Sequence, residues 1–141
     1  MTAHGVLLHE EGLSPRSKAL DACPDGPALF LLDAGRLMEV GATRRWVAFQ
    51  VALVREVEAV VGRSIEIRVG RPEEAIPAFC REHGLAVLHV DRVASPWLDD
   101  WRGASGTSVR FELYAPEPVE TPPVDRLRFK PFWEAIRKGF Q

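Results

Sequence analysis

Hydrophobic positions between residues 62 and 92 predict a strand, a helix and a second strand. The first strand is indicated by branched residues at every second position, Ile65, Ile67 and Val69, a pattern typical of a strand with one face more buried than the other. Residues 85–90 are almost continuously apolar, as expected of a parallel strand covered on both faces. Parallel strands joined by a crossover helix need both faces covered, so the rest of the chain must supply further strands and helices.

The intervening helix has clear end signals. Pro72 suits a first helical position, where its missing N–H costs nothing, and Gly84 suits the left-handed residue that ends a helix. Pro77 lies about one turn inside the helix, so it is expected to remove one backbone hydrogen bond or to bend the first turn.

The same patterns predict the other elements. We expect a strand at residues 5–9, a second at 28–32, a connector with one helical turn at 34–41, a helix at 44–61 with Thr43 as N-cap, a short helix opened by Ser95 and Pro96, and an edge strand at 108–114. The long helix is expected to pack one apolar stripe on the sheet, formed by Trp46, Phe49, Leu53, Val57 and Val60.

The composition changes after residue 114. Residues 115–124 contain four prolines, which are incompatible with a sheet interior and predict an extended strap. Residues 127–141 then predict a short amphipathic helix. We therefore expect an α/β domain at 1–114, with the strap and the C-terminal helix at 115–141 packed on it.

Composition and charge narrow the class of protein. The 141 residues carry a net charge of −2, which does not favour nucleic-acid binding by overall charge. Cys23, Cys80 and four scattered histidines have no metal-ligand spacing, so no metal site is predicted. No window reaches the roughly 18 apolar residues of a membrane span, and there is no signal-peptide pattern. A soluble cytoplasmic protein with reduced thiols is expected.

Five strands alternating with helices predict a three-layer, Rossmann-like α/β domain with a parallel five-stranded sheet. Several details resemble the N-terminal α/β domain of DNA photolyases and cryptochromes: the second strand ends in Asp33, the long helix opens with Arg45, the next turn has Gly70 and Pro72, and the chain closes with Lys130-Pro131-Phe132-Trp133. The resemblance implies a strand order of 3-2-1-4-5 and an antenna chromophore, a folate or a deazaflavin, or a nucleotide as ligand.

The chain also departs from that family. Residues 9–16, HEEGLSPR, stand where the family has a basic cluster, and Arg71 stands where an acidic residue usually precedes the proline. The flavin-bearing helical domain does not follow within this sequence. The resemblance therefore implies neither flavin binding nor DNA repair by this chain alone.

In a doubly wound sheet, ligands bind beyond the carboxyl ends of the strands, at the point where the strand order reverses. With the implied order, this point lies between the first and fourth strands. The predicted cofactor-binding residues at this edge are His9, Glu10, Asp33, Arg45, Gly70, Arg71, Asp91 and Arg92. Solvated loop ends, with Arg44 and Arg45 paired to Glu39 or Asp33, are the alternative.

No catalytic motif is found. The adjacent Glu10 and Glu11 point in different directions, the serines lack a nucleophile-elbow context, and there is no GxGxxG or Walker sequence. His89, inside an apolar strand, is expected to be a core histidine with one satisfied nitrogen. No catalytic residue is predicted.

Aromatic residues gather in two places, at Trp97 and Trp101 and near the C-terminus. They either cover the sheet or meet a partner, and Phe129, Phe132, Trp133 and Phe140 are the candidate docking residues. The sequence thus favours a non-catalytic module that binds a small cofactor or nucleotide, or docks on itself or on a flavin-bearing partner. The alternatives are a light-dependent DNA-repair subunit completed by that partner, and a structural relic without ligand.

Overall fold

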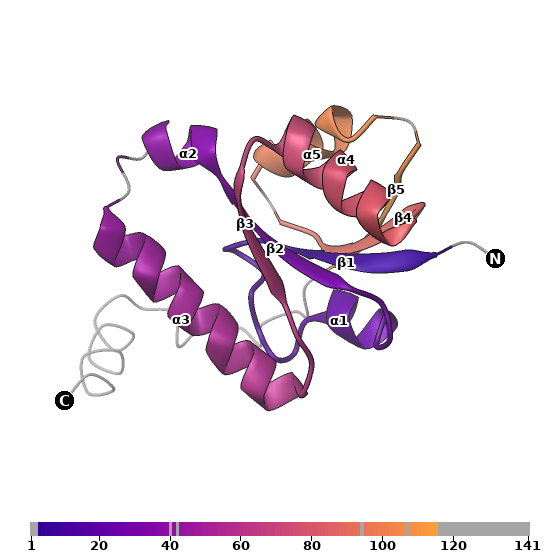
Figure 1. Cartoon of the computed structure of the whole chain (residues 1–141), viewed down its shortest axis with the longest axis horizontal. Helices are drawn as coiled ribbons and strands as arrows, with labels where there is room; N and C mark the ends of the chain where they lie inside the picture. The colour runs from indigo at the N-terminus through magenta and orange to yellow at the C-terminus, as the bar shows by residue number, and fades with distance from the viewer. Residues whose placement is uncertain (1–2, 40, 42, 94, 107, 116–141) are drawn as a thin grey trace, which may run out of the picture.

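The fold is a parallel sheet between two layers of helices (Figure 1). The computed structural model describes residues 3–39, 41, 43–93, 95–106 and 108–115. Along the chain the elements are β1 (His4–Leu8), α1 (Lys18–Ala22), β2 (Ala28–Asp33), α2 (Ala34–Glu39), α3 (Arg44–Val61), β3 (Glu66–Gly70), α4 (Pro72–His83), β4 (Val87–Asp91), α5 (Trp97–Ala104) and β5 (Arg110–Tyr114).

The sheet confirms the predicted fold class and strand order. Its order is β3-β2-β1-β4-β5, and every neighbouring pair is parallel. The order reverses between β1 and β4, where Val6 pairs with His89 and Leu7 with Val90. All five carboxyl ends therefore meet at one edge of the sheet, which is the edge expected to bind ligands.

Alternate residues of the central strands fill two apolar layers. The residues that face α4 and α5 include Leu7, Leu29 and Leu88, whereas those that face α1 and α3 include Leu8 and Phe30. Each layer contains one buried free cysteine, Cys80 in the first and Cys23 in the second. Burial raises the pKa of the Cys80 thiol to about 11.

The end signals of the helices are largely confirmed. Thr43 caps α3 by accepting a hydrogen bond from the backbone N–H of Trp46, and α3 and α4 end at Gly62 and Gly84, both with positive φ. Helix α4 begins at Pro72 as predicted, and Pro77 lies inside it. Ser95 does not cap α5, because its hydroxyl donates to Glu11 and Pro96 occupies the cap position.

The predicted buried stripe of α3 is wrong in part. Phe49 is 58% exposed and Val60 is 69% exposed, while Gln50, Val54 and Val57 are the buried residues. A helix turns about 100° per residue, so the stripe through Phe49 and Val60 lies beside the buried face.

Hydrogen bonds join α3 to the residue that precedes β3. Glu58 accepts from the backbone N–H of Ile65 at 2.7 Å and pairs with Arg55, which also contacts the Ile65 carbonyl. These polar contacts lie on the flank of the helix that faces Ile65. The apolar flank with Phe49 consequently points away from it.

Strand β3 lies at the sheet edge, and its apolar positions are unequally buried. Ile65, which precedes the strand, is buried, but Val69 near the carboxyl end is 59% exposed. Strand β5 forms the opposite edge, as predicted. Among the described residues, no helix has the length and apolar character that crossing a membrane requires. The strap and C-terminal helix were predicted at 115–141, and all of this segment after residue 115 lies outside the described residues.

Candidate functional site

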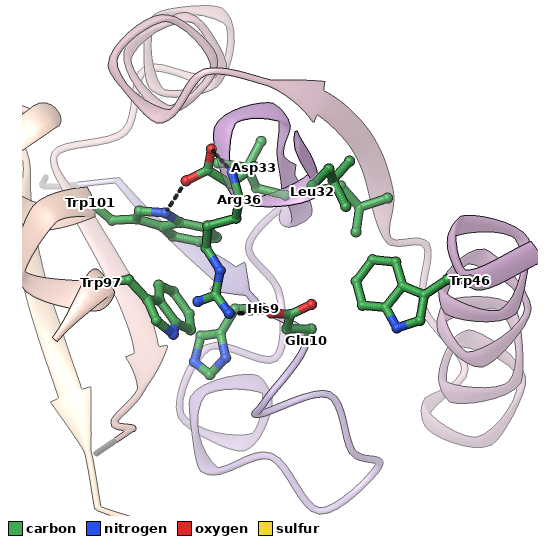
Figure 2. A pocket seen from close by; sticks show the side chains of 10 residues that line it. His9, Glu10, Leu32, Asp33, Arg36, Trp46, Trp97 and Trp101 are labelled. Atoms are coloured by element: carbon green, nitrogen blue, oxygen red, sulfur yellow. Dashed lines mark hydrogen bonds and ion pairs between the residues drawn. The ribbon is translucent and has the colours of Figure 1, made fainter. Parts of the chain in front are cut away.

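A cleft lined by aromatic side chains lies at the carboxyl edge of the sheet (Figure 2). His9 and Glu10 follow β1, and Asp33 ends β2. Helix α2 contributes Arg36, helix α3 contributes Trp46 from its first turn, and helix α5 contributes Trp97 and Trp101. Residues from segments far apart in the sequence therefore line the same cleft.

The Asp33 carboxylate joins two of these elements. Its Oδ1 accepts hydrogen bonds from the backbone N–H groups of Gly35 at 2.9 Å and Arg36 at 3.4 Å, in the first turn of α2. Its Oδ2 accepts from the indole N–H of Trp101 at 3.0 Å. Asp33 thus holds α2 and α5 in place and has little capacity left for a ligand.

Arg36 has one buried nitrogen that lacks an acceptor. Its Nη2 donates to Glu10 Oε1 at 2.7 Å, and its guanidinium lies 4.5 Å from the centroid of the Trp97 ring. Its Nη1 is buried and has no hydrogen-bond acceptor among the described residues. Figure 2 shows the guanidinium between Trp97, His9 and Glu10. A buried donor without a partner costs about 1–3 kcal/mol, so this nitrogen favours an acceptor brought by a ligand.

His9 is held as a neutral imidazole. Its Nδ1 accepts from the backbone N–H of Gly12 at 3.0 Å, so its Nε2 carries the proton and donates to the Asp91 carbonyl at 2.7 Å. Burial is the main cause that lowers the pKa of His9. With both nitrogens occupied, His9 fixes the loop after β1 against β4 and is not available as a general base.

This arrangement predicts that the fold weakens at mildly acidic pH. Folded His9 has a lowered pKa, whereas unfolded His9 takes up a proton near pH 6.5. The unfolded state then binds more protons, so the free energy of unfolding should fall as the pH drops below about 6.5. Urea unfolding between pH 7.5 and 5.5 would measure this, and His9→Gln should show a shallower slope. Equal slopes would assign the effect to other groups, such as His89, whose pKa is also lowered by burial.

Two hollows adjoin at the cleft. The smaller, of about 20 Å³, is lined by His9, Glu10 and Trp46 among others, and the larger has a volume of about 330 Å³. Asp33, Arg36, Trp97 and Trp101 line both hollows. The larger one has the size of a small-molecule site, and the smaller one admits roughly one water-sized group.

The structure brings some predicted site residues together and separates others. His9, Glu10 and Asp33 line the small hollow, and Arg71 joins Asp33 at the large one. Gly70 pairs in register with Asp33. Asp91 and Arg92 line a third hollow of about 280 Å³, together with residues of the loop after β1.

Arg45 is exposed and lines none of these three hollows, and no ion pair between Arg45 and Asp33 or Glu39 is present among the described residues. Its predicted role in binding stays a prediction. The predicted docking residues lie outside the described residues: Phe129, Phe132, Trp133 and Phe140.

The site residues that sequence reasoning missed are Arg36, Trp46, Trp97 and Trp101. A signal existed for the two tryptophans of α5, because their four-residue spacing places them on one face of a helix that follows a central strand. Trp101 is 3% exposed and bonded to Asp33, so it covers the sheet, while Trp97 stacks with Arg36 at the cleft. For Arg36, the one sequence feature that could have predicted a place in the site is its position three residues after Asp33.

Ser17 and His89, which line neither hollow of the cleft, make structural hydrogen bonds. The Ser17 hydroxyl donates to the Asp91 carboxylate and accepts from the backbone N–H of Leu20, as the N-cap of α1. His89 has both nitrogens bonded, to His4 at 2.8 Å and to the Tyr114 hydroxyl at 2.7 Å, where one satisfied nitrogen was predicted. Within the described residues, no group of three or more His, Cys, Asp or Glu side chains could hold a metal ion. The aromatic walls and the buried Arg36 nitrogen of the cleft suit the binding of a small ligand.

The fold and the cleft define a doubly wound, Rossmann-like α/β domain with an aromatic hollow at the carboxyl edge of its sheet. In comparisons with known proteins, no family model matches the chain and no curated sequence matches it significantly. The resemblance to photolyases and cryptochromes therefore stays a prediction from sequence.

Proposed function

We propose that this domain is a non-catalytic module that binds a small planar cofactor or nucleotide-like ligand, of the kind that serves as an antenna chromophore. The observation that carries the proposal is the position of Arg36 at the junction of the two hollows, where it stacks on Trp97 and its buried Nη1 has no acceptor among the described residues. The place of the cleft supports it, since ligands of doubly wound sheets bind at the carboxyl edge. The resemblance to photolyases and cryptochromes favours a chromophore.

Two side chains of the cleft, Trp97 and Arg36, would stabilise a bound planar ligand. The indole of Trp97 offers a flat apolar surface, on which aromatic rings stack with about 0.5–1.5 kcal/mol beyond the effect of buried area. A ligand acceptor at Arg36 Nη1 would also remove the cost of its missing hydrogen bond. His9, the histidine that lines this cleft, has both ring nitrogens in structural hydrogen bonds, so it is not free to act as a base there.

The first test is an absorption spectrum from 300 to 500 nm of protein purified from its native host, with mass spectrometry of the molecule released on denaturation. A bound aromatic compound in a stoichiometric amount is the expected result. A colourless protein from which denaturation releases no small aromatic molecule would contradict the proposal.

The released compound should then bind through Arg36. Arg36→Met keeps most of the side-chain volume but removes the charge and the N–H donors, and should weaken binding about tenfold or more in a calorimetric titration. Arg45→Met is the matched control, because Arg45 is an exposed arginine away from the three hollows. Equal losses in both variants would mean that a general charge effect, or the site predicted from sequence around Arg45, governs binding.

A further inference from the structure

We infer that the ligand of this cleft is an uncharged heteroaromatic ring of the guanine type, with a carbonyl on one edge and N–H donors on the next, and that a phosphate group on it weakens binding. The inference rests on the proposed function and specifies its ligand class. It follows from the charges and donors of the two hollows.

The small hollow fits one acceptor atom. Arg36 is the cation at this hollow: its Nη2 is already paired with Glu10, and its Nη1 is the nitrogen of this side chain that is buried without a partner among the described residues. A volume of about 20 Å³ takes about one water-sized group, such as a carbonyl oxygen, whereas a phosphate with its several oxygens is larger.

The rim of the large hollow is acidic. Glu39, Glu73 and Asp100 line it, all exposed, and none of them forms an ion pair within the described part of the chain. The cations that line the same hollow are Arg36 and Arg71. Carboxylates accept hydrogen bonds and repel anions, so this rim favours N–H and amino groups and disfavours phosphate.

A guanine-type ring presents the complementary pattern. It carries carbonyl and ring-nitrogen acceptors that arginine recognises, and an amino group with an adjacent N–H that can donate to carboxylates. Its flat face can lie on Trp97, which lines both hollows. Adenine lacks the carbonyl, so it satisfies the rim less completely and leaves Arg36 with a weaker acceptor.

The experiment is calorimetric titration of the full-length protein with guanosine, guanosine 5′-monophosphate and adenosine. Guanosine should bind at least about tenfold more tightly than either of the others at low salt. The gap between guanosine and its monophosphate should narrow as salt is added, because exposed charges are screened. Tighter binding of the monophosphate, or equal binding of guanosine and adenosine, would overturn the inference and leave the proposed cofactor site standing.

Rim variants separate charge repulsion from simple exclusion by size. Glu73→Gln should narrow the gap between guanosine and its monophosphate several-fold, because it removes a negative charge but keeps a side-chain oxygen that can accept from the ring N–H groups. Glu74→Gln is the matched control, because Glu74 is the next residue of α4, is also exposed, and does not line the hollow. Identical effects of the two variants would contradict a role for the rim. If none of the three probes binds while the purified protein carries another aromatic compound, the inference fails and the proposed function holds.

Discussion

Replacing Phe79 by alanine is expected to lower the free energy of unfolding by about 3–5 kcal/mol. Phe79 is fully buried in α4 and packs in the layer between α4, α5 and the sheet. The substitution removes a large apolar surface from that layer and leaves a cavity that close-packed neighbours fill only in part. Urea unfolding monitored by circular dichroism would measure the loss.

Phe49→Ala is the matched control. The same atoms are removed from a helix, but Phe49 is 58% exposed, so the free energy of unfolding should change by only about 0.5 kcal/mol. A large loss in this variant would mean that another part of the chain, or a second molecule, covers Phe49 in solution.

The second large effect is expected for Asp33→Ala, which should cost about 2–4 kcal/mol of unfolding free energy. About 1 kcal/mol comes from the lost cap of α2, and about 1–3 kcal/mol from the buried Trp101 indole N–H left without its acceptor. Thermal unfolding would measure the loss, and a cost below 1 kcal/mol would show that Asp33 does not hold these elements.

Asp33→Asn separates the two contributions. The side-chain oxygen of asparagine can still cap α2, but its amide N–H₂ then faces the donor of Trp101. The variant should therefore keep the cap and lose the indole bond, which places its stability between that of the wild type and that of Asp33→Ala. A stability equal to that of the wild type would assign the whole effect of Asp33→Ala to the cap.

Local periodicity and end signals were enough to predict the fold class. The continuous apolar run at 85–90 and the alternation at 65–69 identified two parallel strands, and Thr43 and Gly62 marked the observed ends of α3. These signals are local because each arises from backbone geometry within a few residues. The strand order came instead from the family resemblance, and the sheet has that order.

The rotation of α3 was not predictable from its own residues. Two overlapping apolar stripes run along this helix, and the one containing Phe49 has the larger side chains. The flank opposite Phe49 is joined to the backbone of Ile65, where Arg55 donates to the carbonyl and Glu58 accepts from the N–H. Ile65 lies beyond the end of α3, so the periodicity of the helix residues alone could not show which stripe would be buried.

The structure has hollows at the edge where a ligand site was predicted, but four of the side chains that line them were not among the predicted site residues. His9, Glu10 and Asp33 follow directly from strand ends, whereas Arg36 reaches the cleft only because Asp33 caps the short helix α2 and Trp97 lies opposite. The connector at 34–41 was expected to hold one helical turn, and nothing in its composition indicated which face would turn inward.

Each helical layer contains one cysteine, so the reaction of its thiol with a reagent can report local opening of that layer. Cys80 belongs to α4 and Cys23 directly follows α1, so the two lie on opposite faces of the sheet, and both are buried. Thiol reagents attack the exposed thiolate, which the raised pKa of Cys80 makes scarce at neutral pH while α4 stays docked. The rates at which the two thiols are modified therefore compare how often each side of the sheet opens, without any introduced label.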